Sequence, residues 1–328
     1  MKKISMIMPV YNEADGVEIF HSALIAELTK LQNRYEFEIM YIVDKSTDNT
    51  LDILKRIAEQ SRNVVVLGLS RRFGHQMSLT CGIDNCTGDA AIMMDSDLEH
   101  PPQIISAMLE CYENGFDVVR TRRAYSNEVS LYKRLSSKLY YKFLNFLSEE
   151  RLSEDVADFR LISRKVIDVF KEDIREHNQY LRGLFSWVGF EQTELVFMSD
   201  KRKVGKSKYN LRRLLNFGLQ GIVSFSKVPL KLAIIIGITI AILGILYGFS
   251  TAIERLFDPS IAPAGWVSLI TITLIIGGIQ LIMLGVIGEY IGSIFDEVKG
   301  RPLYIIEKHY GKTMNKVSAS LRRQRRVR

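Results

Sequence analysis

Residues 88–102 read GDAAIMMDSDLEHPP, in which an apolar segment runs directly into acidic residues and a proline pair. Ala90–Met94 has the composition of a short buried strand, and Asp95 and Asp97 follow at its end. Side chains two positions apart on a strand share a face, so we expect both carboxylates on one side. Two such carboxylates repel each other unless a cation lies between them, and hard, oxygen-preferring Mg²⁺ or Mn²⁺ suits the pair. The segment predicts a metal site at a strand end, although a lone D-x-D is also common by chance.

Short apolar runs and helical patterns alternate through about the first 120 residues. The runs typical of buried strands are Ile4–Met8, Glu36–Val43, Val64–Leu69, Ala90–Met94 and Asp117–Val119. The helical patterns between them are Val17–Leu31, Asp48–Gln60, His75–Asn85 and Pro101–Asn114. This alternation predicts an α/β fold with a mostly parallel sheet and helices on both faces. Because ligands bind outside the carboxyl ends of such strands, the polar residues that follow them are the candidates for a functional site.

Two further strand ends carry polar residues. Pro9-Val10-Tyr11-Asn12-Glu13 follows the first strand, and Asp44 ends the second. Neither the G-x-G-x-x-G of a dinucleotide site nor the G-x-x-x-x-G-K of a P-loop is present in the required context. Asp44 is placed to accept hydrogen bonds from a ribose hydroxyl or a base edge, and as a solitary residue it could equally form a turn or cap a helix.

The region from about Leu230 to Phe295 is apolar and almost free of charge. Ala233–Ile253 and Trp266–Gly288 are each long enough to cross a hydrocarbon core about 30 Å thick. The linker Glu254–Gly265 contains two prolines and cannot continue a helix. Lysine and arginine are concentrated before the first segment and after the second, so the positive-inside rule places both ends in the cytosol. We therefore predict an integral membrane protein with two transmembrane helices.

The chain carries a formal net charge of +7, which favours an anionic partner. Much of the excess lies in Lys201–Arg213 and in the C-terminal arginines, on either side of the apolar region, and this favours a membrane surface over nucleic acid. Tyr209–Pro229 is predicted to form a helix along the membrane surface, while the basic helix of Ser130–Leu147 could cover the sheet or contact lipid. The three cysteines have no metal-binding spacing, and the N-terminal apolar run is too short for a signal peptide, so the N-terminus is expected to stay in a reducing cytosol.

The chain resembles the inverting GT-A glycosyltransferases that act on polyprenyl phosphates. This family includes bactoprenol glucosyltransferases, lipid transferases for aminoarabinose and glucosamine, and dolichyl-phosphate mannose synthases. The matching segments are PVYNE, VDKSTDNT, LSRRFGHQMSLTCGID, GDAAIMMDSDLEHPP, VADFRLISRKV, YLRGLFSWVGF, KRKVGKSKYNLRRL and LGVIGEYIGSIFDEVKGRPLY. They extend over nearly the whole chain, and the last two are similar to bacterial members with two spans. Where the family usually has D-D-G-S-T-D, this chain has Val43-Asp44-Lys45-Ser46, which leaves one acid for recognition of the base.

The resemblance implies a domain organisation and a donor site. It implies a GT-A (Rossmann-like) catalytic domain over residues 1–208, interfacial helices over 209–231, a transmembrane hairpin over 232–295 and a cytosolic basic tail over 296–328. The residues implied to bind the nucleotide-sugar are Pro9, Tyr11, Glu13, Asp44, Arg71 and Asp95. Asp95 and Asp97 would bind Mg²⁺ or Mn²⁺, with Asp97 the main ligand, and the cation would neutralise the diphosphate leaving group.

The resemblance also implies an acceptor site. Asp158, in VADFR, occupies the position of the family's catalytic acid, so Asp158 and Asp97 are the candidate catalytic residues. A phosphate acceptor is already anionic, so Asp158 could act as a general base, orient the acceptor or stabilise the sugar cation, and alternatively it could cap a following helix. The cations implied to bind the acceptor phosphate are Arg160, Arg182, Arg202, Lys206 and Lys208. His75 and His100 flank the site, and neither has partners at zinc spacing.

The implied reaction is transfer of glucose from UDP-glucose to undecaprenyl or another polyprenyl phosphate, with inversion. Donors such as GDP-mannose or a UDP-amino sugar remain alternatives, as does a non-catalytic scaffold that binds nucleotide-sugars at the membrane. A processive polysaccharide synthase is less favoured, because the chain has Q-x-x-R at Gln179–Arg182 without the following tryptophan. Small-residue faces near Gly277 and Gly288 predict a homo-oligomer.

Overall fold

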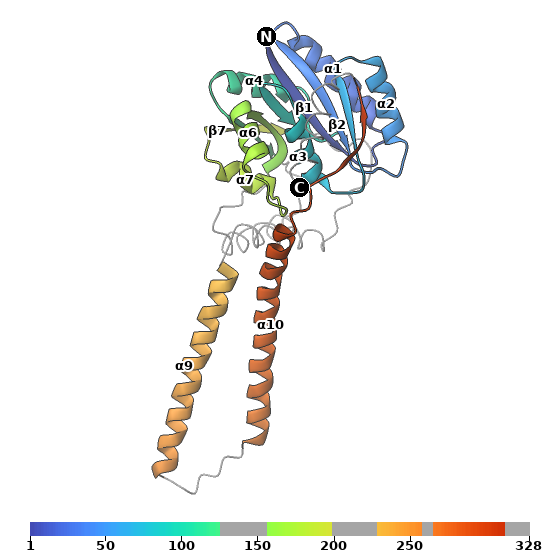
Figure 1. The fold of residues 1–328 in the computed structure, drawn as a ribbon. Helices are drawn as coiled ribbons and strands as arrows, with labels where there is room; N and C mark the ends of the chain where they lie inside the picture. Colours follow the sequence, from blue (N-terminus) through green and yellow to red (C-terminus); the bar gives the residue numbers. More distant parts are fainter. Residues whose placement is uncertain (125–155, 199–227, 258–264, 312–328) are drawn as a thin grey trace. The chain divides into compact units, whose positions relative to one another are not determined.

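The structure is a computed structural model that describes residues 1–124, 156–198, 228–257 and 265–311 (Figure 1). It divides into two compact units, which we call the sheet unit and the hairpin unit. The sheet unit comprises Met1–Lys138, Ser153–Asn210 and Arg301–Arg328, and the hairpin unit comprises Leu139–Leu152 and Leu211–Gly300. The helix predicted over 130–147 lies outside the described residues. Of the helix predicted over Tyr209–Pro229, residues 209–227 also lie outside them, and the last two residues begin α9.

The sheet unit is built on a mixed sheet of eight strands in the order β7-β5-β6-β4-β1-β2-β3-β8. Its strands are β1 (Lys2–Val10), β2 (Tyr35–Val43), β3 (Val64–Leu69), β4 (Ala90–Met93), β5 (Val118–Ala124), β6 (Val156–Ser163), β7 (Gln192–Met198) and β8 (Ile306–Tyr310). Strands β1 to β4 pair in parallel, whereas β6 runs antiparallel to both β4 and β5. The α/β fold with a largely parallel central sheet is therefore confirmed.

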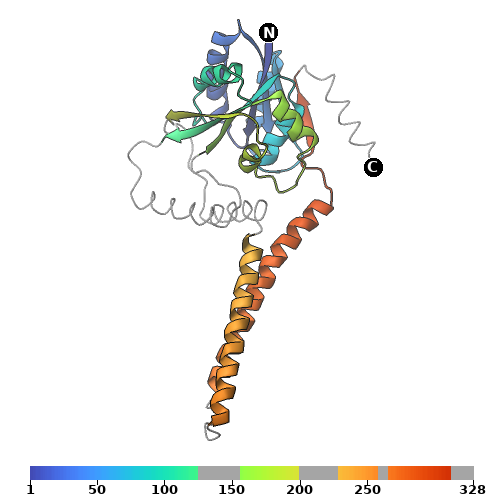
Figure 2. The same ribbon diagram turned by 90° about the vertical axis from the view of Figure 1, so that its left-hand side faces the viewer.

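Helices cover both faces of this sheet (Figure 1 and Figure 2). They are α1 (Val17–Leu31), α2 (Thr50–Gln60), α3 (His75–Asn85), α4 (Ile104–Glu113), α6 (Arg164–Glu172) and α7 (Leu181–Trp187). Alternation along β1 divides the core: Met6 packs in one cluster with Phe20 of α1, while Ile7 faces α3. At Gly82 of α3 an added Cβ would lie 2.2 Å from the Ile7 side chain, so only glycine allows α3 to approach β1 this closely.

Two helices begin later than the sequence pattern predicts. The second begins at Thr50 rather than at Asp48, because the Asp48 carboxylate accepts the backbone N–H groups of Thr50 at 3.1 Å and Ala14 at 3.2 Å. The fourth begins at Ile104, after the proline pair that we placed in its first turn. In both cases the preceding residues form the loop that leaves the carboxyl end of a strand.

Strand β8 falls within the range 296–328 that the resemblance implied to be a basic tail. Residues Ile306–Tyr310 pair antiparallel with β3, and the Ser70 N–H donates to the Ile305 carbonyl at 2.9 Å. Gly311 follows with φ +107°, and an added Cβ there would lie 2.3 Å from the Val64 carbonyl oxygen. The chain after the apolar region thus returns to complete one edge of the sheet.

The hairpin unit contains helices α9 (Val228–Phe257) and α10 (Trp266–Val298). Among the described residues, one segment, Ile275–Val298, has the length and apolar composition of a membrane span. The apolar part of α9, Ala233–Tyr247, is shorter than the 18 residues that define a candidate span. The structure therefore supports one candidate transmembrane helix where the sequence predicted two. Large apolar side chains are exposed along both helices, for example Leu246 at 59% and Leu281 at 71%.

Candidate active site

The loops that follow β1 and β2 are fastened to each other at the carboxyl edge of the sheet. Asn12 adopts a left-handed backbone with φ 54°, and its side-chain oxygen accepts the Thr47 N–H at 2.8 Å. The Glu13 N–H donates to the Thr50 hydroxyl at 3.0 Å. The predicted nucleotide residues Tyr11 and Glu13 therefore stand on a framework shared by two strand ends, and the Arg72 guanidinium lies over the Tyr11 ring at 4.1 Å.

Pro9 is tolerated inside β1 because of where β1 ends its pairing with β4. The two strands are in register only from Ile4 to Ile7, so the missing N–H of Pro9 costs no bond on that side. On the other side Pro9 lies opposite Ile42 of β2, and its carbonyl accepts the Ser96 hydroxyl at 3.5 Å. Pro9 thus joins the first strand to the loop that carries the acidic pair.

Asp44 is 4% exposed and holds the loop before α3. Its two carboxylate oxygens accept the backbone N–H groups of Phe73 at 2.7 Å and Gly74 at 2.9 Å. Gly74 has φ +97°, which a side chain would make strained. Arg71 lies over the Phe73 ring at 4.1 Å in the same loop. The contacts of Asp44 and Arg71 with a nucleotide stay a prediction.

Asp95 and Asp97 lie in the loop after β4, which ends at Met93, rather than within the strand. Their side chains are nevertheless partly exposed while Ser96 between them is buried, so they keep the alternation of a strand. The Asp97 carboxylate accepts the Glu99 N–H at 3.0 Å across Leu98, whose φ of 64° costs roughly 1–2 kcal/mol for a non-glycine residue. The loop holds both acids at the sheet edge by its own hydrogen bonds.

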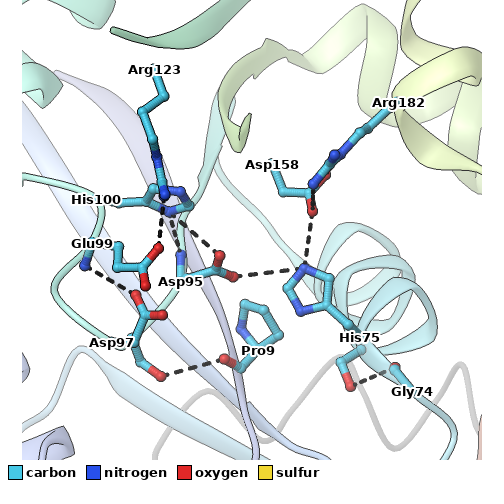
Figure 3. A network of polar contacts seen from close by, with 12 residues as sticks. Pro9, Gly74, His75, Asp95, Asp97, Glu99, His100, Arg123, Asp158 and Arg182 are labelled. Atoms are coloured by element: carbon cyan, nitrogen blue, oxygen red, sulfur yellow. Dashed lines mark hydrogen bonds and ion pairs between the residues drawn. The ribbon is translucent and has the colours of Figure 1, made fainter. Parts of the chain in front are cut away.

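His75, the first residue of α3, links Asp95 to Asp158 (Figure 3). Its Nε2 lies 3.6 Å from an Asp95 oxygen and 3.3 Å from an Asp158 oxygen. Asp158 lies within β6 and is 8% exposed, so it does not cap α6, whose N-cap is Ser163. Arg182 of α7 donates to both Asp158 oxygens, at 2.8 and 2.9 Å. We call the four residues Asp95, His75, Asp158 and Arg182 the acid–base chain.

Within the acid–base chain, the pKa values of His75 and Asp158 are shifted by their neighbours. Burial opposes the charged form of His75 most strongly, but the carboxylates of Asp95 and Asp158 outweigh it and raise its pKa to about 9. Burial likewise opposes the charge of Asp158, yet Arg182 and His75 hold its pKa well below the usual range. A carboxylate stabilised in this way is a weak proton acceptor. The geometry thus favours an orienting or charge-stabilising role for Asp158 over a general base.

Two of the five predicted acceptor cations lie beside Asp158. Arg182 forms the bidentate pair, and Arg160 is on the same strand as Asp158, directly opposite Arg120 of β5. Arg160 is 2% exposed, and its burial lowers its pKa to about 10. Its guanidinium lies 4.5 Å from the centre of the Phe185 ring. The other three, Arg202, Lys206 and Lys208, lie outside the described residues.

The donor set at the acidic pair fits a hard cation that takes its other ligands from a substrate. Asp95 and Asp97 supply carboxylate oxygens, and Asp95 is 33% exposed. Within the described residues no group of three or more His, Cys, Asp or Glu is placed to hold a metal. Mg²⁺ and Mn²⁺ sites commonly use one or two carboxylates together with water and substrate phosphates. Two acids at an open edge therefore suit a cation shared with a diphosphate.

His75 is the residue of this site that the sequence argument set aside. We judged it only as a zinc ligand, and it has no partners at zinc spacing. The available signal was its position, because His75 begins the helix after the third strand and the loop 70–74 joins the two at the edge where Asp44 and Asp95 lie.

The sheet unit is a helix-covered α/β sheet with acids and ion-paired cationic side chains at its carboxyl edge, an arrangement that suits an enzyme with an anionic substrate. The chain belongs to the Glycosyl transferase family 2, whose family model matches residues 5–170, and it is a glycosyltransferase. A second model, described as the GtrB C-terminal hairpin, matches residues 228–294. The family resemblance inferred from the sequence is thereby confirmed.

Relatives of similar length share over a third of their residues with this chain. It is 39% identical to "Uncharacterized glycosyltransferase YkcC" of Bacillus subtilis, over 94% of each protein. It is 38% identical to the SfII prophage-derived bactoprenol glucosyl transferase of Shigella flexneri, over 94% of this chain and 98% of the relative. Among solved structures, the glucosyl-3-phosphoglycerate synthase of Mycobacterium tuberculosis in complex with Mn²⁺, UDP and phosphoglyceric acid is 17% identical, with a TM-score of 0.47 over 68% of this chain and 76% of that one.

Proposed function

We propose that this enzyme transfers glucose from UDP-glucose to a polyprenyl phosphate, with inversion at the sugar. The observation that carries the proposal is the acid–base chain, which places a buried carboxylate paired with two cationic side chains next to the acidic pair. Such a site suits a reaction in which two anions, a leaving diphosphate and an attacking phosphate, meet at one sugar. The Shigella flexneri relative, named a bactoprenol glucosyl transferase, supports the choice of sugar and acceptor.

The chain's own residues divide between the two anions. Asp95 and Asp97 would hold Mg²⁺ or Mn²⁺ against the diphosphate, and the cation supplies Lewis-acid stabilisation of the leaving group. Pro9, Tyr11, Glu13, Asp44 and Arg71 would form the nucleotide side of the site. On the other side Asp158 holds Arg182 in a fixed orientation, and Arg182 with Arg160 would align the acceptor phosphate. Arg202, Lys206 and Lys208 would add to this attraction.

The hairpin unit would hold the enzyme at the surface where the acceptor headgroup lies. We propose a catalytic domain over residues 1–208, an interfacial segment over 209–231 and a two-helix hairpin over 232–295. Both termini would lie in the cytosol. The glycine faces of the hairpin helices would mediate self-association. Exposed Leu246 and Leu281 support contact of both helices with lipid, since water would leave such side chains unfavourably solvated. Within the proposed tail of 296–328, Ile306–Tyr310 belongs to the sheet.

The test is a reconstitution with a panel of donors. Purified full-length protein is incubated with undecaprenyl phosphate, Mg²⁺ or Mn²⁺, and labelled UDP-glucose, GDP-mannose or a UDP-amino sugar in separate reactions. We expect a glucosylated lipid phosphate from UDP-glucose, with inverted anomeric configuration by NMR. A product from a different donor would correct the sugar and retain the reaction class. Absence of any lipid product with every donor would overturn the proposal.

A further inference from the structure

Helix α3 connects the acid–base chain to a second polar cluster at its other end. Its first residue, His75, contacts Asp95 and Asp158, and its last two residues are Asp84 and Asn85. The polar cluster around Asp84 has no part in the proposed chemistry. Its partners come from distant parts of the chain and converge on this one helix end.

Asp84 receives three hydrogen bonds there. The guanidinium of Arg175 donates to both carboxylate oxygens, at 2.7 and 3.0 Å, and the Tyr304 hydroxyl donates at 2.7 Å. The Asp84 side chain is 9% exposed. Asn85 in turn donates to the Tyr304 oxygen at 3.3 Å. A partly buried carboxylate with this many donors has little freedom to move.

Tyr304 is itself fixed by the sheet. It precedes Ile305, whose carbonyl accepts the Ser70 N–H at 2.9 Å, and then β8 pairs with β3. His177 bonds the Arg301 carbonyl on the other side of Tyr304. Burial raises the pKa of the Tyr304 hydroxyl, so it remains a hydrogen-bond donor to Asp84. The segment Arg301–Tyr310 is thus bonded on both sides of Tyr304, and Tyr304 joins it to the end of α3.

The first half of α3 also contacts the residues at the start of α7. The side-chain oxygen of Gln76 accepts the Leu181 N–H at 3.2 Å, and Thr80 bonds Gln179. Leu181 is the first residue of α7, and Arg182 follows it. Helix α3 therefore positions two partners of Asp158: His75 directly and Arg182 through these contacts.

A displacement at Asp84 would be transmitted along the helix. Residues Ser78–Ile83 are all buried, and Gly82 packs against Ile7 and Ile42 with no room for even one more carbon. Close-packed interiors shift as units rather than deform locally. We therefore expect a shift at the Asp84 end of this 11-residue helix to shift His75 at its other end.

We propose that Tyr304 and Asp84 are positioning residues for sugar transfer, because their hydrogen bond fixes α3 and thereby places His75 and Arg182 against Asp158. This proposal rests on the proposed function, because one of its tests measures the rate of sugar transfer. It gives the segment after α10 a role in the reaction that the predicted basic tail did not have.

The main test is Tyr304→Phe in the full-length protein, with Tyr310→Phe as matched control. Tyr310 is on the same segment, opposite Val66, and has Lys55 over its ring at 5.7 Å. Loss of one partly buried hydrogen bond should lower kcat about three- to tenfold in Tyr304→Phe. The KM for the donor should change less than kcat, because Tyr304→Phe removes a hydrogen bond to Asp84 and not a side chain assigned to nucleotide binding. Tyr310→Phe should leave both constants unchanged.

A second measurement does not depend on transfer. Hydrogen exchange should become faster at the α3 amides of residues 78–86 in Tyr304→Phe and in Asp84→Asn, and stay unchanged in Tyr310→Phe. An unchanged kcat together with unchanged α3 exchange in folded Tyr304→Phe would overturn the proposal, as would equal losses in Tyr310→Phe. If the wild type makes no lipid-linked sugar, the proposed function fails, and α3 exchange alone then decides whether Tyr304 holds the helix.

Discussion

Two buried carboxylates lie near opposite ends of the central strands, and their surroundings differ. Glu38, near the amino ends, is 4% exposed and accepts hydrogen bonds from the Ser5 hydroxyl at 2.7 Å and the Thr87 N–H at 3.0 Å. Asp158, near the carboxyl ends, is 8% exposed and is bonded by Arg182 and His75. Both acids are buried and both are satisfied. Burial and hydrogen bonding therefore do not distinguish a structural acid from a functional one.

The kind of partner does distinguish them. Most of the donors to Glu38 are neutral, and its one cationic partner among the described residues, Lys3, lies at 3.5 Å. None of these partners connects Glu38 to an acid of the candidate active site. Asp158 is held by two cationic side chains, one of which leads on to Asp95. Gathering charges in a partly buried place costs desolvation free energy that a neutral network avoids. The acid–base chain has this desolvation cost and lies at the strand ends where ligands bind, and both features indicate a functional site.

The largest effect should come from exchanging each acid for its amide. Asp158→Asn should reduce sugar transfer by about 10²–10³-fold, because the cations that it holds lose their orienting charge. Glu38→Gln should lower the thermal midpoint and leave transfer per folded molecule within about threefold. The measurement is the initial rate of sugar transfer, divided by the concentration of folded protein in each sample. A comparable loss of transfer in Glu38→Gln would show that the two buried acids do not differ in function.

A second effect tests the acids that face the donor. Asp97→Ala should lower transfer by at least about 100-fold, since even the partners of metal ligands are worth about 10–100-fold. It should also raise the Mn²⁺ concentration needed for half-maximal rate. The matched control is Glu113→Ala, whose acid pairs with Lys2 at the amino end of β1. Undiminished transfer by Asp97→Ala would refute the metal role of the pair.

A third, smaller effect tests whether charge or shape matters at the middle of the acid–base chain. His75→Gln keeps a hydrogen-bonding side chain and removes the cation between Asp95 and Asp158, so transfer should fall about tenfold. His75→Lys restores a positive charge and should recover part of that loss. Rates at saturating donor provide the comparison. Equal activity of the two variants would show that the charge of His75 is not what the site uses.

Much of this arrangement follows from local sequence pattern. Apolar runs such as Val64–Leu69 locate the strands, and strand ends bring Pro9, Asp44 and Asp95 to one edge. The apolar runs are nearly continuous there because both faces of a parallel sheet are buried. The candidate donor side could thus be predicted without knowing which side chains touch.

The unpredicted parts depend on contacts between distant residues. Strand β8 is short, carries Glu307 and Lys308, and lies at an edge of the sheet. The sequence therefore has no clear apolar pattern that would predict its pairing with β3. His75 gains its role only from Asp95 and Asp158, and no spacing rule for metal ligands selects such a bridge. Long-range pairing of this kind is set by tertiary packing rather than by local propensity.

The smallest effect concerns the pH dependence of stability. The His75 pKa is raised from 6.5 to about 9, so its ion pairs stabilise the fold fully below about pH 6.5 and lose that contribution as pH rises through about 9. The lowered pKa of Asp158 works in the opposite direction, since its contribution is present above its unfolded pKa and is lost only at strongly acid pH.

With EDTA present, so that no cation competes for Asp95, the wild type should melt about 2–4 °C above His75→Gln at pH 6. Because the His75 side chain is 41% exposed, solvent screens these pairs and the difference should not be larger. Thermal melts of both proteins between pH 6 and 10 make the measurement. A gap that stays constant over this range would mean that His75 is not ionised in the folded protein, and that the site's acids are joined by a neutral hydrogen bond, as Glu38 is to its neighbours.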